Sequence, residues 1–367
     1  MGDTVIFRSQ FQALSSMGVQ VGVLSAHPEE TEKRYKGVKC FDVRKGRLRA
    51  VLAGLFWCDI AVVGGGELVQ DQSSGLYTPF NLLPLFLAFF LRKKSFAWAV
   101  GIGQGKELGK FSRLLTKLAM KTTSGITVRD RGSFNTLYRL GCREPEMILV
   151  SDCALASDFP EEKKLNIIGA APRNVSNRQR HLLPLEMRKK LGLYRETDPV
   201  PAAAAWAALL DGHVRKHSSD VVLFPFHTGS LSNNDRGFCR LVQEKMKMKE
   251  RVTIAEPAYL EAFLKMLSRC PVLVTTPLHG SILAVSTGTV PVSVSYSSKC
   301  VRFMKQAGLD RFISCGKPGI PDNGTALLLE KAWQEFRGMQ EQLQSTASNL
   351  ACRADRTAEH FRKSLSL

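Results

Sequence analysis

A strand–helix–strand pattern over residues 271–309 constrains the fold of this chain more than any other feature of its sequence. The apolar, β-branched runs at 272–274 and 290–294 have the length and composition of buried strands. Residues 281–286 between them have helical character, which predicts two parallel strands joined by a helix. Open α/β sheets place their ligands just beyond the carboxyl ends of such strands.

Polar residues follow both of these expected strands. His279 and Gly280 come directly after the first strand, and Lys299 follows the second. Because parallel strands end on the same edge of a sheet, we expect His279 and Lys299 to lie at successive strand-to-helix turns on one edge. A packed core histidine and a solvated lysine would explain the same residues, so the pattern by itself leaves a structural and a functional explanation open.

The same alternation of strands and helices runs through the rest of the chain. Further strands are expected at 19–24, 59–63, 95–100, 126–128, 147–150, 165–170, 220–226 and 252–255. A polar stretch at 158–164 resembles a linker. The sequence therefore predicts an α/β fold of two doubly wound Rossmann-like domains, 1–157 and 158–325, around a cleft, followed by a helix and polar tail at 326–367.

The beginning of the chain departs from this pattern. Residues 3–14 already have helical character, with Gly2-Asp3 at the cap. A doubly wound domain ordinarily begins with a strand ahead of its first helix. We therefore expect a first domain that lacks its first strand, as in an isoform or a fragment.

The charge of the chain indicates an anionic partner. The formal net charge is +18 and the isoelectric point is about 9.7, which suits a phosphorylated substrate, an acidic lipid surface or nucleic acid. The basic residues are dispersed in short clusters, and no zinc-finger spacing, RNP-like motif or basic zipper is present. A nucleic-acid partner is therefore not expected, although charge alone leaves it open.

The nine cysteines are odd in number and scattered, with no CxxC pair. This usage predicts reduced thiols in a cytoplasmic protein rather than a disulfide framework. The most apolar window, 82–91, is shorter than the roughly 20 residues that a membrane-spanning helix needs. A buried core helix is expected there, and an interfacial helix against lipid headgroups is the alternative.

Other candidate anion contacts follow other expected strands. Gly65 and Gly66 come after the 59–63 run, where glycines let backbone amides approach an anion or a sugar. Arg129 follows 126–128, and its planar fork suits a phosphate or a carboxylate, although a structural pair with a neighbouring aspartate explains it slightly better. Arg173 has the corresponding place in the second half. The histidines show no metal-ligand spacing, so no metal is expected.

Taken together and in order, these segments resemble the polysaccharide pyruvyl transferase family over roughly residues 2–310. The residues that carry the resemblance are Gly2-Asp3, Gly64-Gly65-Gly66-Glu67-Leu68, Asp71, Gly101-Ile102-Gly103, Arg129-Asp130, Ser133, Leu137, Gly141, Asp152, Leu278-His279-Gly280, Ala284, Gly288, Pro291, Tyr296, Lys299, Phe303 and Gly308-Leu309. The resemblance implies a GT-B-like fold. It also implies transfer of the enolpyruvyl unit of phosphoenolpyruvate to a sugar as a pyruvate ketal, with no cofactor besides the donor.

The resemblance further implies roles for individual residues. His279, Arg129 and Lys299 would contact the donor, with His279 as general acid–base, a task that suits a side chain of ordinary pKa near 6.5. Arg173 would assist, and the amides around Gly65, Gly66 and Gly280 would line the substrate site. The acceptor would be a glycan, including a lipid-linked one, with peripheral membrane contact.

The sequence departs from the family at one point near the histidine. Pro277 stands where the family has an arginine, two residues before His279. Two alternatives to pyruvyl transfer follow from the same residues. One is a GT-B glycosyltransferase that uses a nucleotide sugar, and the other is a relative that binds glycans without turnover.

Overall fold

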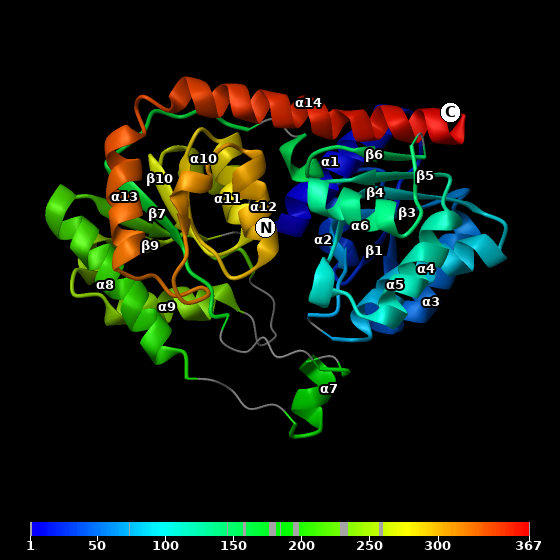
Figure 1. Ribbon diagram of the computed structural model, residues 1–367, viewed down its shortest axis with the longest axis horizontal. Coiled ribbons are helices and arrows are strands. Elements are labelled where there is room, and N and C mark those ends of the chain that lie inside the picture. The colour runs from blue at the N-terminus through cyan, green and yellow to red at the C-terminus, as the bar shows by residue number, and fades with distance from the viewer. Residues whose placement is uncertain are drawn as a thin grey trace. The chain divides into compact units, whose positions relative to one another are not determined.

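The structure is a computed structural model that describes residues 2–72, 74–144, 146–156, 159–175, 181–183, 185–193, 198–227, 234–256 and 260–366. The chain divides into two compact units. Unit 1 contains residues 1–5, 157–178 and 195–351, and unit 2 contains residues 6–156, 179–194 and 352–367. Each unit is described by itself below, with the element labels of Figure 1.

Unit 2 contains two separate parallel sheets. One pairs β1 (Gly22–Ser25) with β2 (Lys39–Asp42). The other has the order β3-β4-β5-β6, with bounds Ile60–Val69, Lys94–Ile102, Gly125–Val128 and Met147–Leu149. Its helices are α1 (Gly2–Ser15), of which residues 2–5 belong to unit 1, α2 (Pro28–Arg34), α3 (Arg47–Trp57), α4 (Tyr77–Phe90), α5 (Lys110–Lys121), α6 (Arg131–Arg139) and α7 (Leu185–Lys190). The expected helix at 3–14 is confirmed, and no described strand precedes it.

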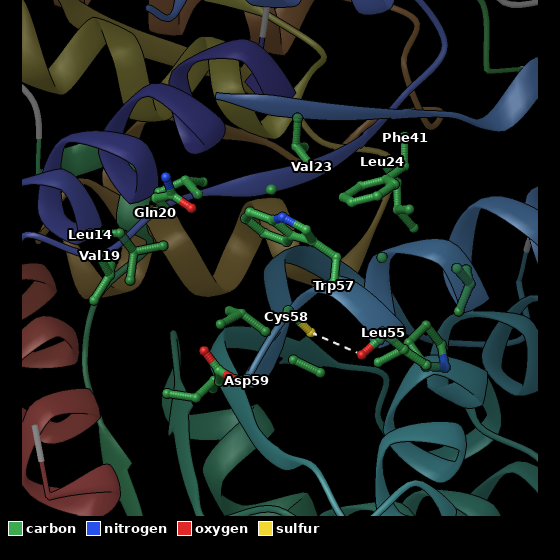
Figure 2. Close-up of a pocket in the computed structure, with 18 of the residues that line it drawn as sticks. Leu14, Val19, Gln20, Val23, Leu24, Phe41, Leu55, Trp57, Cys58 and Asp59 are labelled. Atoms are coloured by element: carbon green, nitrogen blue, oxygen red, sulfur yellow. Dashed lines mark hydrogen bonds between the residues drawn. The ribbon is translucent and has the colours of Figure 1, made fainter. Parts of the chain in front are cut away.

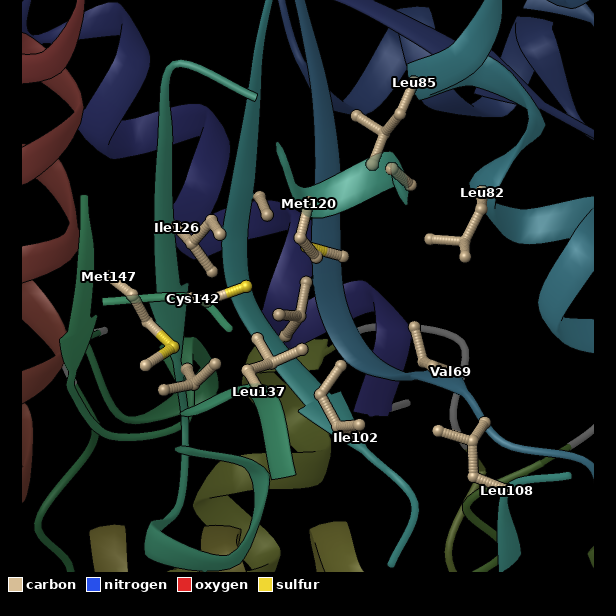
Figure 3. Close-up of a cluster of buried hydrophobic side chains, with 14 residues drawn as sticks. Val69, Leu82, Leu85, Ile102, Leu108, Met120, Ile126, Leu137, Cys142 and Met147 are labelled. Carbon is tan, nitrogen blue, oxygen red and sulfur yellow. The ribbon is translucent and has the colours of Figure 1, made fainter. Parts of the chain in front are cut away.

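The core of unit 2 explains why these segments form strands and helices. Eight of the nine residues of β4 are buried, and only Lys94 at its start is exposed. Figure 3 shows apolar side chains from the sheet meeting those of α4 and α5, among them Leu82, Leu85 and Met120. Leu82, Leu85 and Ala88 are fully buried, so one face of the 82–91 window is part of the core, whereas Phe89 and Phe90 near its end are exposed. Among the described helices none is long and apolar enough to cross a membrane.

Unit 1 is built on one six-stranded parallel sheet of order β12-β11-β10-β7-β8-β9. The strands, in chain order, are β7 (Ile167–Ala171), β8 (Asp220–Leu223), β9 (Val252–Ile254), β10 (Val272–Thr275), β11 (Val290–Val294) and β12 (Ile313–Ser314). The helices are α8 (Val200–His217), α9 (Asp235–Lys245), α10 (Leu260–Ser268), α11 (Leu278–Ser286), α12 (Ser298–Gln306), α13 (Asn323–Glu335) and α14 (Gln340–Leu365), of which residues 352–365 belong to unit 2. Numbered within the unit, the order is 6-5-4-1-2-3, which is that of a Rossmann fold.

Three local expectations are corrected by the structure. The glycines at 64–66 lie inside β3 rather than in a turn after it, at a point where the register with β4 shifts. Helix α11 begins at Leu278, so His279 is in its first turn. The expected polar tail is helical to Leu365, because apolar side chains such as Phe361 are buried against Phe96 and Trp98 of unit 2.

Candidate functional site

Three of the candidate residues leave the same edge of the unit 1 sheet. Strand β10 pairs in parallel with β7 on one side and with β11 on the other. Arg173 follows β7, His279 follows β10 and Lys299 follows β11, so the expectation that His279 and Lys299 lie at successive strand ends is confirmed. The order of the strands reverses between β7 and β10, which places Arg173 and His279 on either side of the switch point, where such folds bind ligands.

His279 is held in a crowded place at the start of α11. It is half-buried, and Gly2 lies against it so closely that a Cβ on Gly2 would overlap the imidazole ring at Nδ1. Gly280 packs against β10 in the same way, because its Cβ would overlap the Thr275 hydroxyl. Both glycines are therefore required by close packing that fixes the position of His279. No local sequence pattern indicates that Gly2 and His279, 277 positions apart, would meet.

Arg173 is paired with Asp235, at the start of α9. The guanidinium donates from Nε to Oδ1 at 2.9 Å and from Nη2 to Oδ2 at 2.6 Å, a bidentate geometry. Asp235 is 2% exposed and also accepts the backbone amide of His227 at 2.9 Å. Burial alone would lower the pKa of Arg173, but the hydrogen bond and charge of Asp235, with a smaller contribution from Tyr296, raise it above its ordinary value. Arg173 is thus a fixed, permanently charged group.

Lys299 lies in the first turn of α12, with its Nζ 5.9 Å from the ring centroid of Tyr296. A cation near the amino end of a helix is unfavourable with respect to the helix dipole, so helix stability does not explain this lysine. The amino ends of α11 and α12 both lie at the strand ends that carry His279 and Lys299. The positive end of each helix dipole adds to an environment that favours anions.

Arg129 lies in unit 2, after β5, and is only 4% exposed. Its Nη1 donates to Oδ2 of Asp152 at 2.8 Å, whereas its Nε is 3.9 Å from Oδ2 of Asp130. Burial would lower the pKa of Arg129, but the charges of Asp152, Glu67 and Asp130 together raise it. The structural pair considered from the sequence therefore exists, mainly with Asp152, while Asp130 caps α6 by accepting the Ser133 amide at 2.9 Å.

Of the glycine motifs of unit 2, the one at Gly101 lies directly against Arg129. A Cβ on Gly101 would lie 2.7 Å from Nε of Arg129, so only glycine leaves room for the guanidinium. Gly65 has a φ of +72° and its Cβ would overlap Ile6, while Gly66 has a φ of +107° with open space beside it. Asp71 accepts from the Gly109 amide at 2.6 Å and the Ser112 hydroxyl at 2.7 Å and so caps α5.

The candidate residues thus form two groups. His279, Gly280, Arg173 and Lys299 share one sheet edge in unit 1, and Arg129, Gly65 and Gly66 belong to unit 2. Two functional contacts could not be predicted from the sequence. One is that of Gly2 with His279. The other is that of Asp235 with Arg173, which is 62 positions away. Within the described part of the chain, no cluster of His, Cys, Asp and Glu is placed to hold a metal ion.

Comparison with solved structures supports the fold. The UDP-GlcNAc 2-epimerase of Neisseria meningitidis bound to UDP-GlcNAc is 10% identical, with a TM-score of 0.61 over 99% of this chain and 98% of that one. A putative UDP-N-acetylglucosamine 2-epimerase of Listeria monocytogenes is 13% identical, with a TM-score of 0.63 over 100% and 94%. Anabaena Alr3699/HepE in complex with UDP-glucose is 11% identical, with a TM-score of 0.55 over 98% and 94%. At these identities the similarity concerns the fold alone, and it confirms the α/β class of two GT-B-like, Rossmann-like domains.

Sequence comparison is more specific about the family. No curated protein matches the chain significantly. The family model described as polysaccharide pyruvyl transferase matches residues 1–298, most of the chain and every candidate residue except Lys299, which directly follows the matched range. The order of the motifs, the Rossmann topology of unit 1 and this match agree, and the chain belongs to the polysaccharide pyruvyl transferase family.

Proposed function

We propose that this protein transfers the pyruvyl group of phosphoenolpyruvate to a sugar of a polysaccharide or lipid-linked saccharide and forms a pyruvate ketal. The observation that carries the proposal is the unit 1 sheet edge, where a histidine stands between two cations at a topological switch point. Phosphoenolpyruvate has a phosphate and a carboxylate on one three-carbon unit. Two cations and two helix amino ends suit this arrangement of anions.

In the proposed mechanism His279 handles the protons. Protonated His279 gives its proton to the methylene carbon of the donor while an acceptor hydroxyl forms a bond to the adjacent carbon. That hydroxyl returns its own proton to the imidazole. A second hydroxyl of the same sugar then displaces phosphate from this carbon, and its proton leaves with the phosphate. All protons are thereby accounted for: the proton first held by His279 is in the new methyl group, that of the first hydroxyl restores the protonated imidazole, and that of the second hydroxyl leaves on the phosphate.

The fixed charges hold the donor for this proton transfer. Lys299 and Arg173 neutralise its two anionic groups, and the Asp235 pair keeps the guanidinium oriented so that little freedom is lost on binding. Gly2 and Gly280 keep the imidazole in one place, which matters because a proton transfer requires contact near hydrogen-bond distance. The family resemblance also implies that Arg129 contacts the donor, and this stays a separate prediction.

The test is a phosphate-release assay with phosphoenolpyruvate and a panel of acceptor glycans, with detection of the ketal by mass spectrometry. We expect His279→Gln to lower turnover by at least about a hundredfold, the usual contribution of a general acid–base. The melting temperature should stay near that of the wild type. His27→Gln is the matched control, because His27 is exposed and its backbone precedes α2. Normal turnover by His279→Gln would contradict the mechanism.

A nucleotide-sugar reaction is the second candidate, since solved structures of the same fold are described with UDP-GlcNAc and UDP-glucose. Isothermal calorimetry separates the two. Binding of phosphoenolpyruvate that weakens in Lys299→Met supports pyruvyl transfer. Binding of UDP-sugars with no response to phosphoenolpyruvate would favour the second candidate instead.

A further inference from the structure

Helix α5 turns its large apolar side chains away from the core of unit 2. Its buried face carries two hydroxyl residues and two apolar ones, Ser112, Thr116, Ala119 and Met120. On the other side, Phe111 is 65% exposed and Leu114 is 54% exposed, and Leu118 one turn further is exposed as well. These three residues recur three and four positions apart and so form one apolar stripe. A surface helix normally packs such a stripe on the core, so folding of unit 2 does not explain its exposure.

The helices beside α5 extend this exposed apolar surface. Helix α4 packs against both α3 and α5, and Figure 1 shows the three helices next to one another. The connections from β3 to β4 and from β4 to β5 run in the same direction, which places α4 and α5 on one face of the sheet. Among the described residues, every exposed phenylalanine lies on these three helices, namely Phe56, Phe80, Phe89, Phe90 and Phe111. Together with Leu114 and Leu118 they form what we call the three-helix face.

The rings of this face are held outward by the fold. In α3, Leu55 and Trp57 line a cavity of about 450 Å³ in unit 2, as Figure 2 shows. Phe56 lies between them in the chain and is 70% exposed. In α4, the ring of Phe80 is covered by the guanidinium of Arg47 from α3, at 4.0 Å from the ring centroid. This arrangement joins a cation and an exposed ring from two helices at one point of the surface.

The charged residues of the three helices are all positive. Helix α3 has two arginines, α5 has four basic residues and α4 has no charged residue, and none of the three contains an aspartate or a glutamate. The four basic residues of α5 are all exposed, namely Lys110, Arg113, Lys117 and Lys121. Lysine and arginine interleaved with phenylalanine and leucine are typical of helices that lie in the headgroup layer of an acidic membrane.

We propose that the three-helix face docks on the surface of a bilayer that contains acidic phospholipids. The phenylalanine and leucine side chains enter the boundary between headgroups and acyl chains, and the basic side chains meet the lipid phosphates. A second copy of this chain fits less well, because a two-fold contact sets the same cations against one another. Nucleic acid would engage the cations but leave the apolar side chains in water. The proposal does not rest on pyruvyl transfer, because none of the docking residues belongs to the candidate site.

The test is co-sedimentation of the full chain with vesicles of phosphatidylcholine alone and with vesicles in which about a third of the lipid is phosphatidylglycerol. We expect partitioning onto the acidic vesicles to be at least about tenfold stronger and to weaken as salt is added. Leu114→Ser should lower this partitioning at least about fivefold. The melting temperature should stay near that of the wild type, because Leu114 is already exposed. Leu327→Ser, at an exposed leucine of α13, is the matched control and should partition like the wild type.

A second pair of variants tests the charge. Lys117→Gln should lower partitioning onto the acidic vesicles at least about threefold at low salt, and Lys245→Gln, at an exposed lysine of α9, should change it less.

Three results would overturn the proposal. The first is equal binding to the two kinds of vesicle, or equal losses in Leu114→Ser and Leu327→Ser. The second is self-association of the wild type without lipid that Leu114→Ser abolishes, because it would assign the face to a second copy. The third is a loss that follows Lys117→Gln alone while random duplex DNA displaces the vesicles, because it would assign the cations to nucleic acid.

Discussion

At the scale of single residues, the contact between Gly2 and His279 predicts a loss of both turnover and stability. Gly2→Ala adds a methyl group that overlaps the imidazole, so we expect turnover to fall at least about tenfold as the ring is displaced. The same overlap should cost about 1–3 kcal/mol of stability, of which the better helix propensity of alanine in α1 offsets at most about 1 kcal/mol. Steady-state kinetics and thermal melting measure the two effects.

Gly212→Ala is the control for this substitution. Gly212 lies within α8 of the same unit, and a Cβ there meets nothing within 4 Å. It should stabilise the protein without affecting turnover. Equal kinetic losses in both variants would show that the Gly2 contact has no special role.

Arg129 leads to a prediction about buried charge. Arg129→Met leaves the Asp152 carboxylate buried and uncompensated, so we expect the free energy of unfolding to fall by about 3 kcal/mol. The double variant with Asp152→Asn should recover part of this loss, and denaturant unfolding of the four proteins gives the coupling energy. No recovery would mean that the pair is not the reason for the loss. A raised KM for phosphoenolpyruvate in the stable double variant would support the donor contact expected from the family.

At the scale of elements, Asp235 at the start of α9 orients the guanidinium of Arg173, which follows β7. Asp235→Asn keeps an acceptor for the backbone amide of His227 but removes the carboxylate that holds Arg173 at two points. We expect kcat/KM for phosphoenolpyruvate to fall about tenfold and the free energy of unfolding to fall by about 3 kcal/mol. Asp220→Asn serves as control, because its ion pair with Arg251 is exposed and should contribute little. An unchanged kcat/KM in Asp235→Asn would show that the pair does not orient the arginine.

At the scale of the whole molecule, His213 makes stability depend on pH. It is buried against Trp333, with ring centroids 4.5 Å apart, and burial followed by the nearby His217 lowers its pKa to about 4. A histidine whose folded pKa lies below its unfolded value of 6.5 is neutral in the folded protein. Its contribution to stability is therefore complete above pH 6.5 and is lost as the pH falls towards 4, to a total of about 3 kcal/mol.

His213→Phe keeps a ring beside Trp333 and removes the titration. Denaturant unfolding at pH 7, 6, 5 and 4 should show the wild type losing about 3 kcal/mol more than this variant over that range. Parallel pH profiles for the two proteins would exclude the effect. His27→Gln, at an exposed position, should follow the wild type throughout.

Much of the secondary structure could be predicted from local pattern. The runs around 272–274 and 290–294 became β10 and β11 because β-branched apolar residues suit a strand buried on both faces. The prediction was wrong at the triple glycine, which continues β3 through a shift of register, and at the polar tail, which is the helix α14. In both cases packing against distant segments, such as Phe361 against Trp98, overrode the local signal.

By itself the sequence determined the α/β class, the family and the edge of the sheet that carries His279 and Lys299. Alternation of strands and helices, and the residues that follow each strand, are local properties that a single chain displays directly. Only the tertiary structure decided that Gly2 contacts His279, that Asp235 holds Arg173 and that Asp152 rather than Asp130 is the main partner of Arg129. These contacts join residues far apart in the chain, and their formation depends on the order and register of strands, which no local pattern specifies.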